Sequence, residues 1–436
     1  MKKQLYLGTA REIISPEIGG CLYGYCPDWH SESKHDDLTV TAYAFTSGDL
    51  KALFISATVC AIKETICEEI FEKISKETGF LKENIILSAT HTHSGPCLSG
   101  GEIGWGGLDT EYAENIFIPG VVKAAVEAVN NAEPVLMGVA SGESKVAVNR
   151  RERTMNNTVT LGQSSWGPVN LNMTVLSFKT PEGNVKGNII AYGCHGTAAG
   201  KNKEITRDWS GVMTDTLEQK SGGLTAFFNG TIGDSGPRLS NGKTVGDITY
   251  VEELGAVAAK DALRIYDSID TYKEGSVSFF DGMVSLPLQP RESYEWACEK
   301  CEEIKGQEAI NLTALTNNHY QEVKKSYEEN YVQQQEREIP QKILRIGNVA
   351  FVASPFEMFS EIGLRIDHAV PDLTVYLMSN ANGTKGYFPT QSELCRGGYE
   401  VGYFINCNIQ RFTDDADFRY IKATVENLGK LEREGA

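Results

Sequence analysis

Short apolar runs alternate with longer amphipathic segments along most of the chain. Residues 52–59 (ALFISATV) form a run typical of a buried strand, residues 62–78 have helical spacing, and residues 84–89 (ENIILS) are the next expected strand. Between 111 and 132, apolar side chains again recur at helical spacing. Further strands are expected at 172–179, 187–193, 223–228, 275–286, 343–353 and 373–379, and further helices near 208–220, 249–267, 357–369 and 412–433. This alternation predicts an α/β fold, in which a mixed β-sheet system is covered by helices.

The stretch 291–338 departs from this pattern. It is rich in Glu, Lys, Gln and Asn, it has helical spacing, and it lacks strand-like runs. We therefore predict a helical insertion here, within one domain that spans residues 1–436. A lid and a contact in a homo-oligomer are both open roles for this insertion.

Composition narrows the classes of function. The hydrophobic fraction of 41% and the charged fraction of 23% are ordinary for a globular protein, and no apolar run approaches the ~20 residues that span a bilayer. The net charge of −17 disfavours nucleic acid and stable membrane insertion among anionic lipids. The N-terminal segment turns polar before an apolar core forms, so we expect no secretory signal and a cytoplasmic location.

Side chains of metal-ligand type follow several predicted strands. His91 and His93 follow IILSAT, His195 follows IIAYGC, and Glu357 follows VAFVASP. In open α/β sheets, ligands bind beyond the carboxyl ends of strands, so these side chains can converge on one site. Zinc takes nitrogen, sulfur and oxygen ligands, and a catalytic zinc keeps one position for water. Three of the seven histidines lie in such turns, and this clustering favours a metal site over separate structural roles.

These segments resemble the catalytic domain of the neutral/alkaline ceramidases. The most specific match is SATHTHSGP at 88–96, which is similar to the zinc-site loop of that family. Further matches occur in family order over nearly the whole chain: NRR at 149–151, CHGT at 194–197, ITRDWSG at 205–211, NGTIGDSGP at 229–237, SPFEMFSEIG at 354–363 and GYFPT…GGYEV at 386–401. On these motifs the chain is identified as a member of that family.

The resemblance implies roles for individual residues. It implies four zinc ligands, namely His91, His195, Glu357 and Tyr399. It also implies three groups around the scissile carbonyl, namely His93, Arg150 and Tyr387. In such a site zinc activates water and polarises the carbonyl, while cationic and hydroxyl donors stabilise the oxyanion. His93 would protonate the leaving amine.

Three polar residues beside these motifs have two open roles each. Arg150 precedes Arg151 and Arg153, and such a charge run is typical of a solvated face, but the asparagine motif favours a substrate contact for Arg150. Asp208 and Asp234 could orient a ligand histidine or cap the helices that follow them.

One loop departs from the family pattern. The family sequence is Gly-Asp-x-Ser-Pro, and its serine has a catalytic role near the metal. Here the order is Gly-Asp-Ser-Gly-Pro over 233–237, so the candidate catalytic Ser235 comes one residue early and Gly236 takes the serine position. A shift of one residue in a tight turn redirects a side chain, which leaves metal-activated water as the expected attacker. We also expect the chain to lack the β-domain that follows the catalytic domain of secreted ceramidases.

The sequence therefore predicts a zinc-dependent hydrolase of an N-acyl amide or related ester bond. Its substrate is expected to be a small-molecule amide or a lipid-like compound. Two alternatives remain: a true ceramidase that acts on N-acylsphingosine lipids, and a catalytically inactive, metal-containing binding protein. The loop 97–112 contains glycines, Glu102, Trp105 and Asp109, a mixture that favours a compact polar ligand over a lipid tail.

Overall fold

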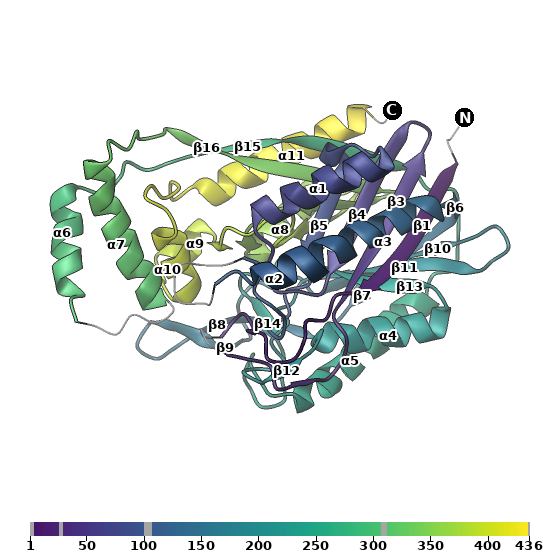
Figure 1. Cartoon of the computed structure of the whole chain (residues 1–436), viewed down its shortest axis with the longest axis horizontal. Helices are drawn as coiled ribbons and strands as arrows, with labels where there is room; N and C mark the ends of the chain where they lie inside the picture. The colour runs from purple at the N-terminus through teal and green to yellow at the C-terminus, as the bar shows by residue number, and fades with distance from the viewer. Residues whose placement is uncertain (1–3, 26–28, 100–106, 307–311, 435–436) are drawn as a thin grey trace.

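Three sheets share a central apolar core in the computed structural model (Figure 1). The structure describes residues 4–25, 29–99, 107–306 and 312–434, and it describes residues 432–434 by their backbone only. A five-stranded sheet has the order β5-β4-β3-β1-β6, and its inner face packs against two four-stranded sheets, β13-β11-β10-β7 and β15-β16-β17-β19. Helices cover the outer face of each of the three sheets.

The five-stranded sheet shows why a continuous apolar run becomes a strand buried on both faces. Its strands are β1 (Leu5–Ile13), β3 (Thr39–Ser47), β4 (Leu50–Ala57), β5 (Ile85–Ala89) and β6 (Glu133–Pro134). Successive side chains of a strand point to opposite faces. In β3, Val40 and Ala42 therefore pack under helices α1 (Glu64–Thr78) and α3 (Ile118–Asn130), while Tyr43 and Phe45 enter the central core.

The two four-stranded sheets each carry a pair of helices. The first consists of β7 (Leu136–Glu143), β10 (Asn172–Lys179), β11 (Val185–Tyr192) and β13 (Leu224–Asn229), covered by α4 (Trp209–Ser221) and α5 (Thr249–Asp267). The second consists of β15 (Val277–Pro287), β16 (Glu336–Ile346), β17 (Val349–Ala353) and β19 (Thr374–Met378), covered by α8 (Ser360–Ala369) and α11 (Ala416–Glu434). The predicted α/β class with a mixed sheet system under helices is confirmed.

Shorter elements complete the fold. They are β2 (Ser33–Lys34), β8 (Ala147–Arg153), β9 (Val159–Ser164), β12 (Glu204–Ile205), β14 (Ser235–Pro237), β18 (Glu357–Met358), β20 (Tyr387–Phe388), the 3-10 helix Lys82–Asn84, α2 (Thr110–Tyr112), α9 (Gln391–Leu394) and α10 (Tyr399–Asn406). Strands β14, β8 and β9 form a small sheet, and β18 pairs with β20.

Several predicted boundaries were wrong for identifiable reasons. The run 343–353 is not one strand but parts of β16 and β17, because Gly347 adopts a left-handed φ of 62° and reverses the chain. The helix expected from 357 begins only at Ser360, because Glu357 and Met358 pair with β20. The helix expected over 111–132 is interrupted by a π-helical turn at Ala113–Phe117.

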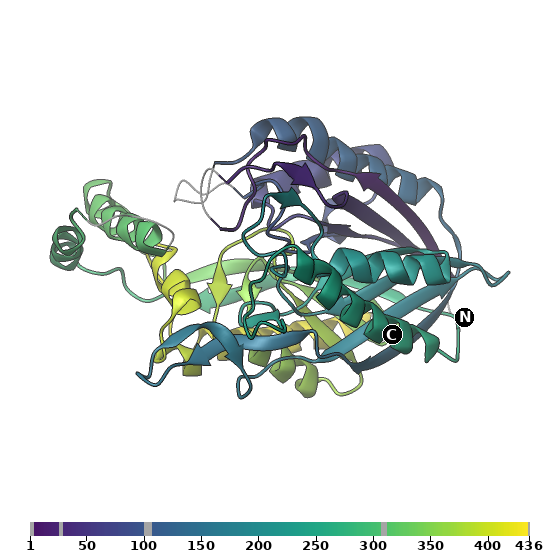
Figure 2. The same ribbon diagram turned by 90° about the horizontal axis from the view of Figure 1, so that it is seen from below.

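Two helices lie within the stretch 291–338. They are α6 (Tyr294–Glu303) and α7 (Leu312–Glu328), and they project together from the body of the molecule (Figures 1 and 2). The Ser293 hydroxyl accepts the Trp296 amide at 3.1 Å and caps α6. The stretch is not free of strand, however, because β16 already begins at Glu336. Its role as a lid or an oligomer contact stays a prediction.

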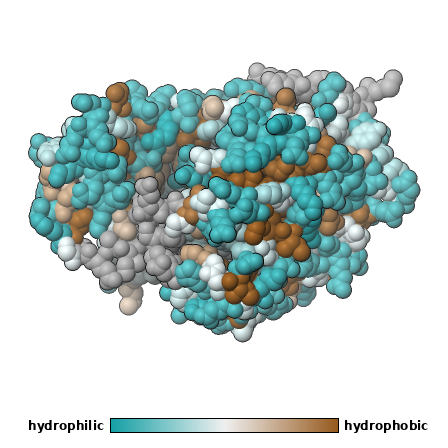
Figure 3. All heavy atoms as spheres, viewed as in Figure 1, coloured by the Kyte–Doolittle hydropathy of each residue, from teal (hydrophilic) through white to brown (hydrophobic). Residues whose placement is uncertain are grey.

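The surface seen in Figure 3 is mostly hydrophilic, with separate hydrophobic patches. Among the helices that the structure describes, none combines the length and the apolar character needed to cross a membrane.

Candidate metal centre and active site

Three separate loops place the predicted metal ligands together. His91 follows β5, His195 follows β11, and Glu357 lies in β18, directly after β17. The first two loops are joined by a bridge between Thr92 and Gly196. A Cβ atom on Gly196 would lie 2.7 Å from the His91 carbonyl oxygen, so this close approach needs glycine.

The ligand atoms of these three residues face one another. The Nε2 atoms of His91 and His195 lie 3.6 and 3.2 Å from Oε2 of Glu357. All three side chains are buried, and their ligand atoms lie within 4.8 Å of one another. His91 has a φ of 67°, which is unusual for a residue other than glycine and is typical of backbone strain at a functional site.

Contacts with backbone carbonyls indicate which nitrogen of each histidine carries the proton. Nδ1 of His91 lies 2.7 Å from the Cys60 carbonyl oxygen, and Nδ1 of His195 lies 3.1 Å from the Ser235 carbonyl oxygen. Because a carbonyl oxygen only accepts, each Nδ1 is the donor and each Nε2 carries a lone pair and no proton. In His195 this lone pair accepts from Arg150 at 2.8 Å. Burial lowers the pKa of both imidazoles below the ordinary value, so both are in the neutral form that binds metals.

This arrangement fits a divalent cation. Oε2 of Glu357 is buried and has no hydrogen-bond partner among the described residues. The nearest nitrogens, Nε2 of His91 and Nε2 of His195, carry no proton to donate to it, so this buried negative charge is unpaired without a cation. Two imidazole nitrogens and one carboxylate oxygen match the ligand set of a catalytic zinc.

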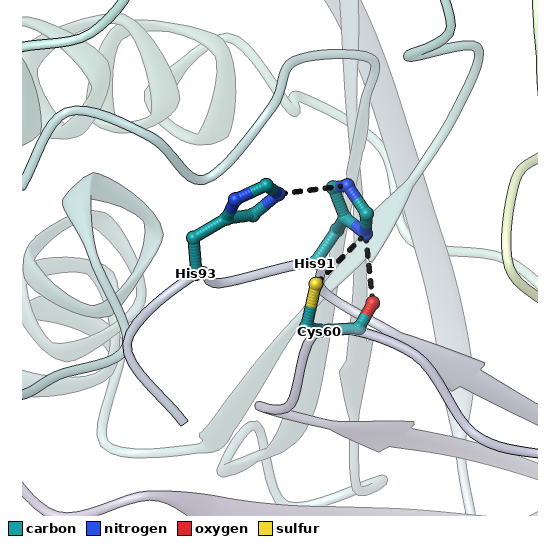
Figure 4. A group of neighbouring side chains, drawn as sticks. All are labelled: Cys60, His91 and His93. Atoms are coloured by element: carbon teal, nitrogen blue, oxygen red, sulfur yellow. Dashed lines mark hydrogen bonds between the residues drawn. The ribbon is translucent and has the colours of Figure 1, made fainter. Parts of the chain in front are cut away.

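A second group of ligand-type atoms overlaps the first at His91. Its members are Cys60, His91 and His93. Figure 4 shows that they approach different nitrogens of the His91 ring: Sγ of Cys60 lies 3.6 Å from Nδ1, and Nε2 of His93 lies 3.1 Å from Nε2. Since Nδ1 is committed to a carbonyl, the group with His195 and Glu357 is the better metal site.

A cavity of about 460 Å³ opens onto these residues. Tyr387 and Tyr399 line it together with His91, His93 and Glu357. The two tyrosine rings lie 5.7 Å apart, and burial raises the pKa of both phenols above the ordinary value. Tyr399, the predicted fourth ligand, stands at the start of α10 on the same cavity.

Arg150 of β8 is held beside the centre by a buried ion pair. Its Nε donates to Glu400 at 2.9 Å, and one terminal nitrogen lies 2.8 Å from Nε2 of His195. The other terminal nitrogen is buried without a hydrogen-bond partner among the described residues. Burial acts to lower the pKa of Arg150, but the acidic groups around it, Tyr387 first, outweigh burial and raise it. Arg150 thus presents a permanent positive charge with an unused donor.

The solvated-face interpretation of this arginine run is wrong for its first two members. Arg151 is buried and donates to Glu400 at 2.5 Å and to Glu393 at 2.9 Å. Only Arg153 is exposed. Glu400 therefore neutralises two buried guanidinium groups at once.

Comparisons with known proteins identify the family of this chain. Neutral/alkaline non-lysosomal ceramidase, N-terminal, is the family that matches residues 12–252, more than half of the chain. The chain belongs to this ceramidase family. Neutral ceramidases A and B of Dictyostelium discoideum are each 26% identical to it, over 228 and 215 residues. These matches cover 50% and 45% of this chain but only 32% and 30% of the two relatives.

Solved ceramidase structures have the same fold. Neutral ceramidase from Pseudomonas aeruginosa superposes with a TM-score of 0.75 at 18% identity, covering 99% of this chain and 75% of that one. A structure described as ceramidase complexed with C2 gives a TM-score of 0.74 at 18% identity, covering 99% and 76% of the respective chains. At this identity the likeness establishes the fold alone.

Ser235, the candidate shifted from the family's serine position, turns away from the cavity. Its hydroxyl donates to the Gly193 carbonyl at 2.9 Å, and it is not among the described residues that line the cavity. Its backbone carbonyl instead receives Nδ1–H of His195. At Gly236, a Cβ atom would lie 2.8 Å from Cβ of Thr244, so this chain has filled the space that a side chain at the ceramidase serine position would need.

Asp208 and Asp234 both hold backbone segments together through hydrogen bonds. Asp208 caps α4 through the Trp209 amide and also accepts the amides of Ala198 and Ala199. Asp234 accepts the backbone amide and the hydroxyl of Ser360, at the start of α8. Neither has a hydrogen bond to a ligand histidine among the described contacts. Burial raises the pKa of each carboxyl to about 6.

Sequence reasoning missed several groups of this site. Cys60 and Asn380 both reach Nδ1 of His91, the latter at 3.0 Å. The hydroxyl of Tyr25 is buried without a hydrogen-bond partner among the described residues, and its ring lies 5.2 Å from that of His93. Cys60 follows β4 in the same way that His91 and His93 follow β5. This position after a strand was the sequence signal that could have indicated Cys60 as a site residue. Glu102 and Trp105 of the predicted polar loop lie outside the described residues.

Proposed function

We propose that this chain is a zinc-dependent hydrolase that cleaves an N-acyl amide or related ester bond. The observation that carries the proposal is the buried, unpartnered Oε2 of Glu357, faced by the Nε2 atoms of His91 and His195. Tyr399 would complete the ligand set from the start of α10. Zinc held there would lower the pKa of a water molecule and polarise the substrate carbonyl.

The residues around the ligands supply the remaining steps. The terminal nitrogen of Arg150 that has no partner among the described residues can stabilise negative charge on the carbonyl oxygen. Tyr387, which lines the cavity, can supply a second donor through its hydroxyl. The Arg150 guanidinium stands 5.4 Å from the centre of the Tyr387 ring, so the two groups can act on one oxyanion. His93, whose Nδ1 has no hydrogen-bond partner in the described part of the chain, would carry a proton to the leaving amine.

Metal analysis and activity together test this proposal. Purified protein should contain one zinc per chain, and chelation should remove zinc and activity together. His195→Ala should lose both, whereas Ser360→Ala, a buried change outside the ligand set, should retain the metal. Protein without stoichiometric metal, or full activity after chelation, would overturn the proposal. Bound zinc without turnover of any amide or ester would support the inactive binding protein instead.

Family membership makes ceramide the second candidate substrate. Each buried CH₂ contributes about 0.8 kcal/mol, so a lipid site should gain affinity steeply with acyl length. A cavity of about 460 Å³ suits a compact ligand. We therefore expect short or polar N-acyl compounds to be cleaved with kcat/KM at least equal to that of long-chain ceramides. Efficiency that rises steadily with acyl length, in detergent-free and mixed-micelle assays, would favour ceramide. The cytoplasmic location and a homo-oligomer stay predictions.

A further inference from the structure

Arg337 places a positive charge on the wall of the active-site cavity. It lies near the start of β16, is half-buried, and lines the cavity that is also lined by His91 and Glu357. Leu315 of α7 and Tyr403 of α10 line the same cavity. Arg337 therefore lines the same cavity as the proposed metal ligands His91 and Glu357, but it lies on another strand, β16.

This guanidinium has little to neutralise it. Among the described residues, no carboxylate forms an ion pair with Arg337. One terminal nitrogen has a long contact of 3.4 Å to the Gln410 carbonyl, and the guanidinium carbon lies 5.2 Å from the centre of the Phe412 ring. The aromatic ring can hold the cation in place without satisfying its donors.

The other cations of the site are paired. Lys385, which lines the same cavity, lies 2.8 Å from Oε1 of Glu64. Arg150 and Arg151 share Glu400. The chain has a net charge of −17 and therefore acidic side chains in excess. Arg337 nevertheless has no ion pair with a described carboxylate. An anionic ligand group would supply the missing partner.

We propose that the substrate carries a carboxylate that binds Arg337 while its N-acyl bond lies at the metal centre. This inference rests on the proposed amide hydrolase function and adds the substrate class, an N-acyl amino acid or a similarly compact N-acyl carboxylate. The planar guanidinium matches a carboxylate with two parallel, charge-assisted hydrogen bonds, whereas a neutral sphingoid chain has no negative charge to pair with it. The cavity volume of about 460 Å³ accommodates a molecule of this size.

A matched pair of substrates tests the inference. N-hexanoylglycine and the neutral N-hexanoylglycinamide differ only in the charged group, and release of hexanoate measures both. The wild type should favour the carboxylate by about 10- to 100-fold in kcat/KM, the ratio expected for hydrogen bonds to a charged group. Arg337→Gln should bring this ratio close to one, chiefly by raising KM for the carboxylate. Lys422→Gln removes one charge from an exposed position of α11. This control variant should keep the wild-type ratio.

The outcomes separate this inference from the proposed function. Hydrolysis of both substrates with equal efficiency would overturn the carboxylate assignment and leave the amide hydrolase standing. A preference that survives in Arg337→Gln would also overturn it. Failure to hydrolyse any amide or ester would overturn both proposals. If Arg337→Gln does not fold, Arg337→Lys serves instead: it keeps the charge but loses the planar fork, so the ratio should fall to between one and the wild-type value.

Discussion

Replacing Glu400 by glutamine should damage both stability and catalysis. Glu400 is 1% exposed and accepts from Arg150 at 2.9 Å and from Arg151 at 2.5 Å. Glutamine keeps the shape but removes the charge that neutralises both guanidinium groups. Arg151 retains Glu393, whereas Arg150 has no other carboxylate ion pair among the described residues.

The expected loss of stability follows from this burial. Removing one partner of a buried ion pair typically costs about 3–5 kcal/mol, because a charge is left uncompensated. Folding free energies are about 5–15 kcal/mol in total, so the change should be large in urea denaturation. The same change frees Arg150 from its place beside His195. If Arg150 stabilises the oxyanion, kcat should fall by about 10²-fold or more.

Glu393→Gln is the matched control for this prediction. Glu393 pairs with Arg151 but not with Arg150, and its side chain is 13% exposed. It should cost less stability and leave kcat near the wild-type value. Equal losses of kcat in the two variants would refute the reasoning that Glu400 acts by positioning Arg150. So would a change of less than about 1 kcal/mol in the free energy of unfolding of Glu400→Gln.

Three further predictions concern single residues. His91→Ala should lose zinc, whereas His93→Ala should keep it and lose mainly kcat; elemental analysis showing equal metal loss would contradict this. Ser235→Ala should retain most activity, whereas Tyr387→Phe should lower kcat by about 10²-fold. An acyl adduct trapped on Ser235 would contradict this prediction. Because burial raises the pKa of Asp234 from 3.8 to about 6, its stabilising contribution is present below 3.8 and lost as pH rises through 6. Asp234→Asn should reduce the fall in stability over this pH range in urea titrations of the metal-free protein, and the part that Asp208 contributes should remain.

The sequence determined the features that depend on local pattern. Helical spacing predicted α5 with its observed ends, Thr249 and Asp267, and alternating or continuous apolar runs predicted β10 at Asn172–Lys179. The order of motifs also predicted which side chains belong together, and the structure brings His91, His195 and Glu357 within reach of one ion. Periodicity suffices to predict helices and strands because it reflects which face of the element each near neighbour in the chain occupies.

Only the tertiary structure decided the partners that come from distant segments. Arg150 meets Glu400 across 250 residues of sequence, and no periodic pattern reports such a contact. The direction of the Ser235 hydroxyl depends on the Gly193 carbonyl of a neighbouring loop. That no described carboxylate pairs with Arg337 is likewise a property of the packed cavity wall. Buried charges take the partner that folding brings within hydrogen-bonding distance, and that choice is made by long-range packing that residue order alone does not reveal.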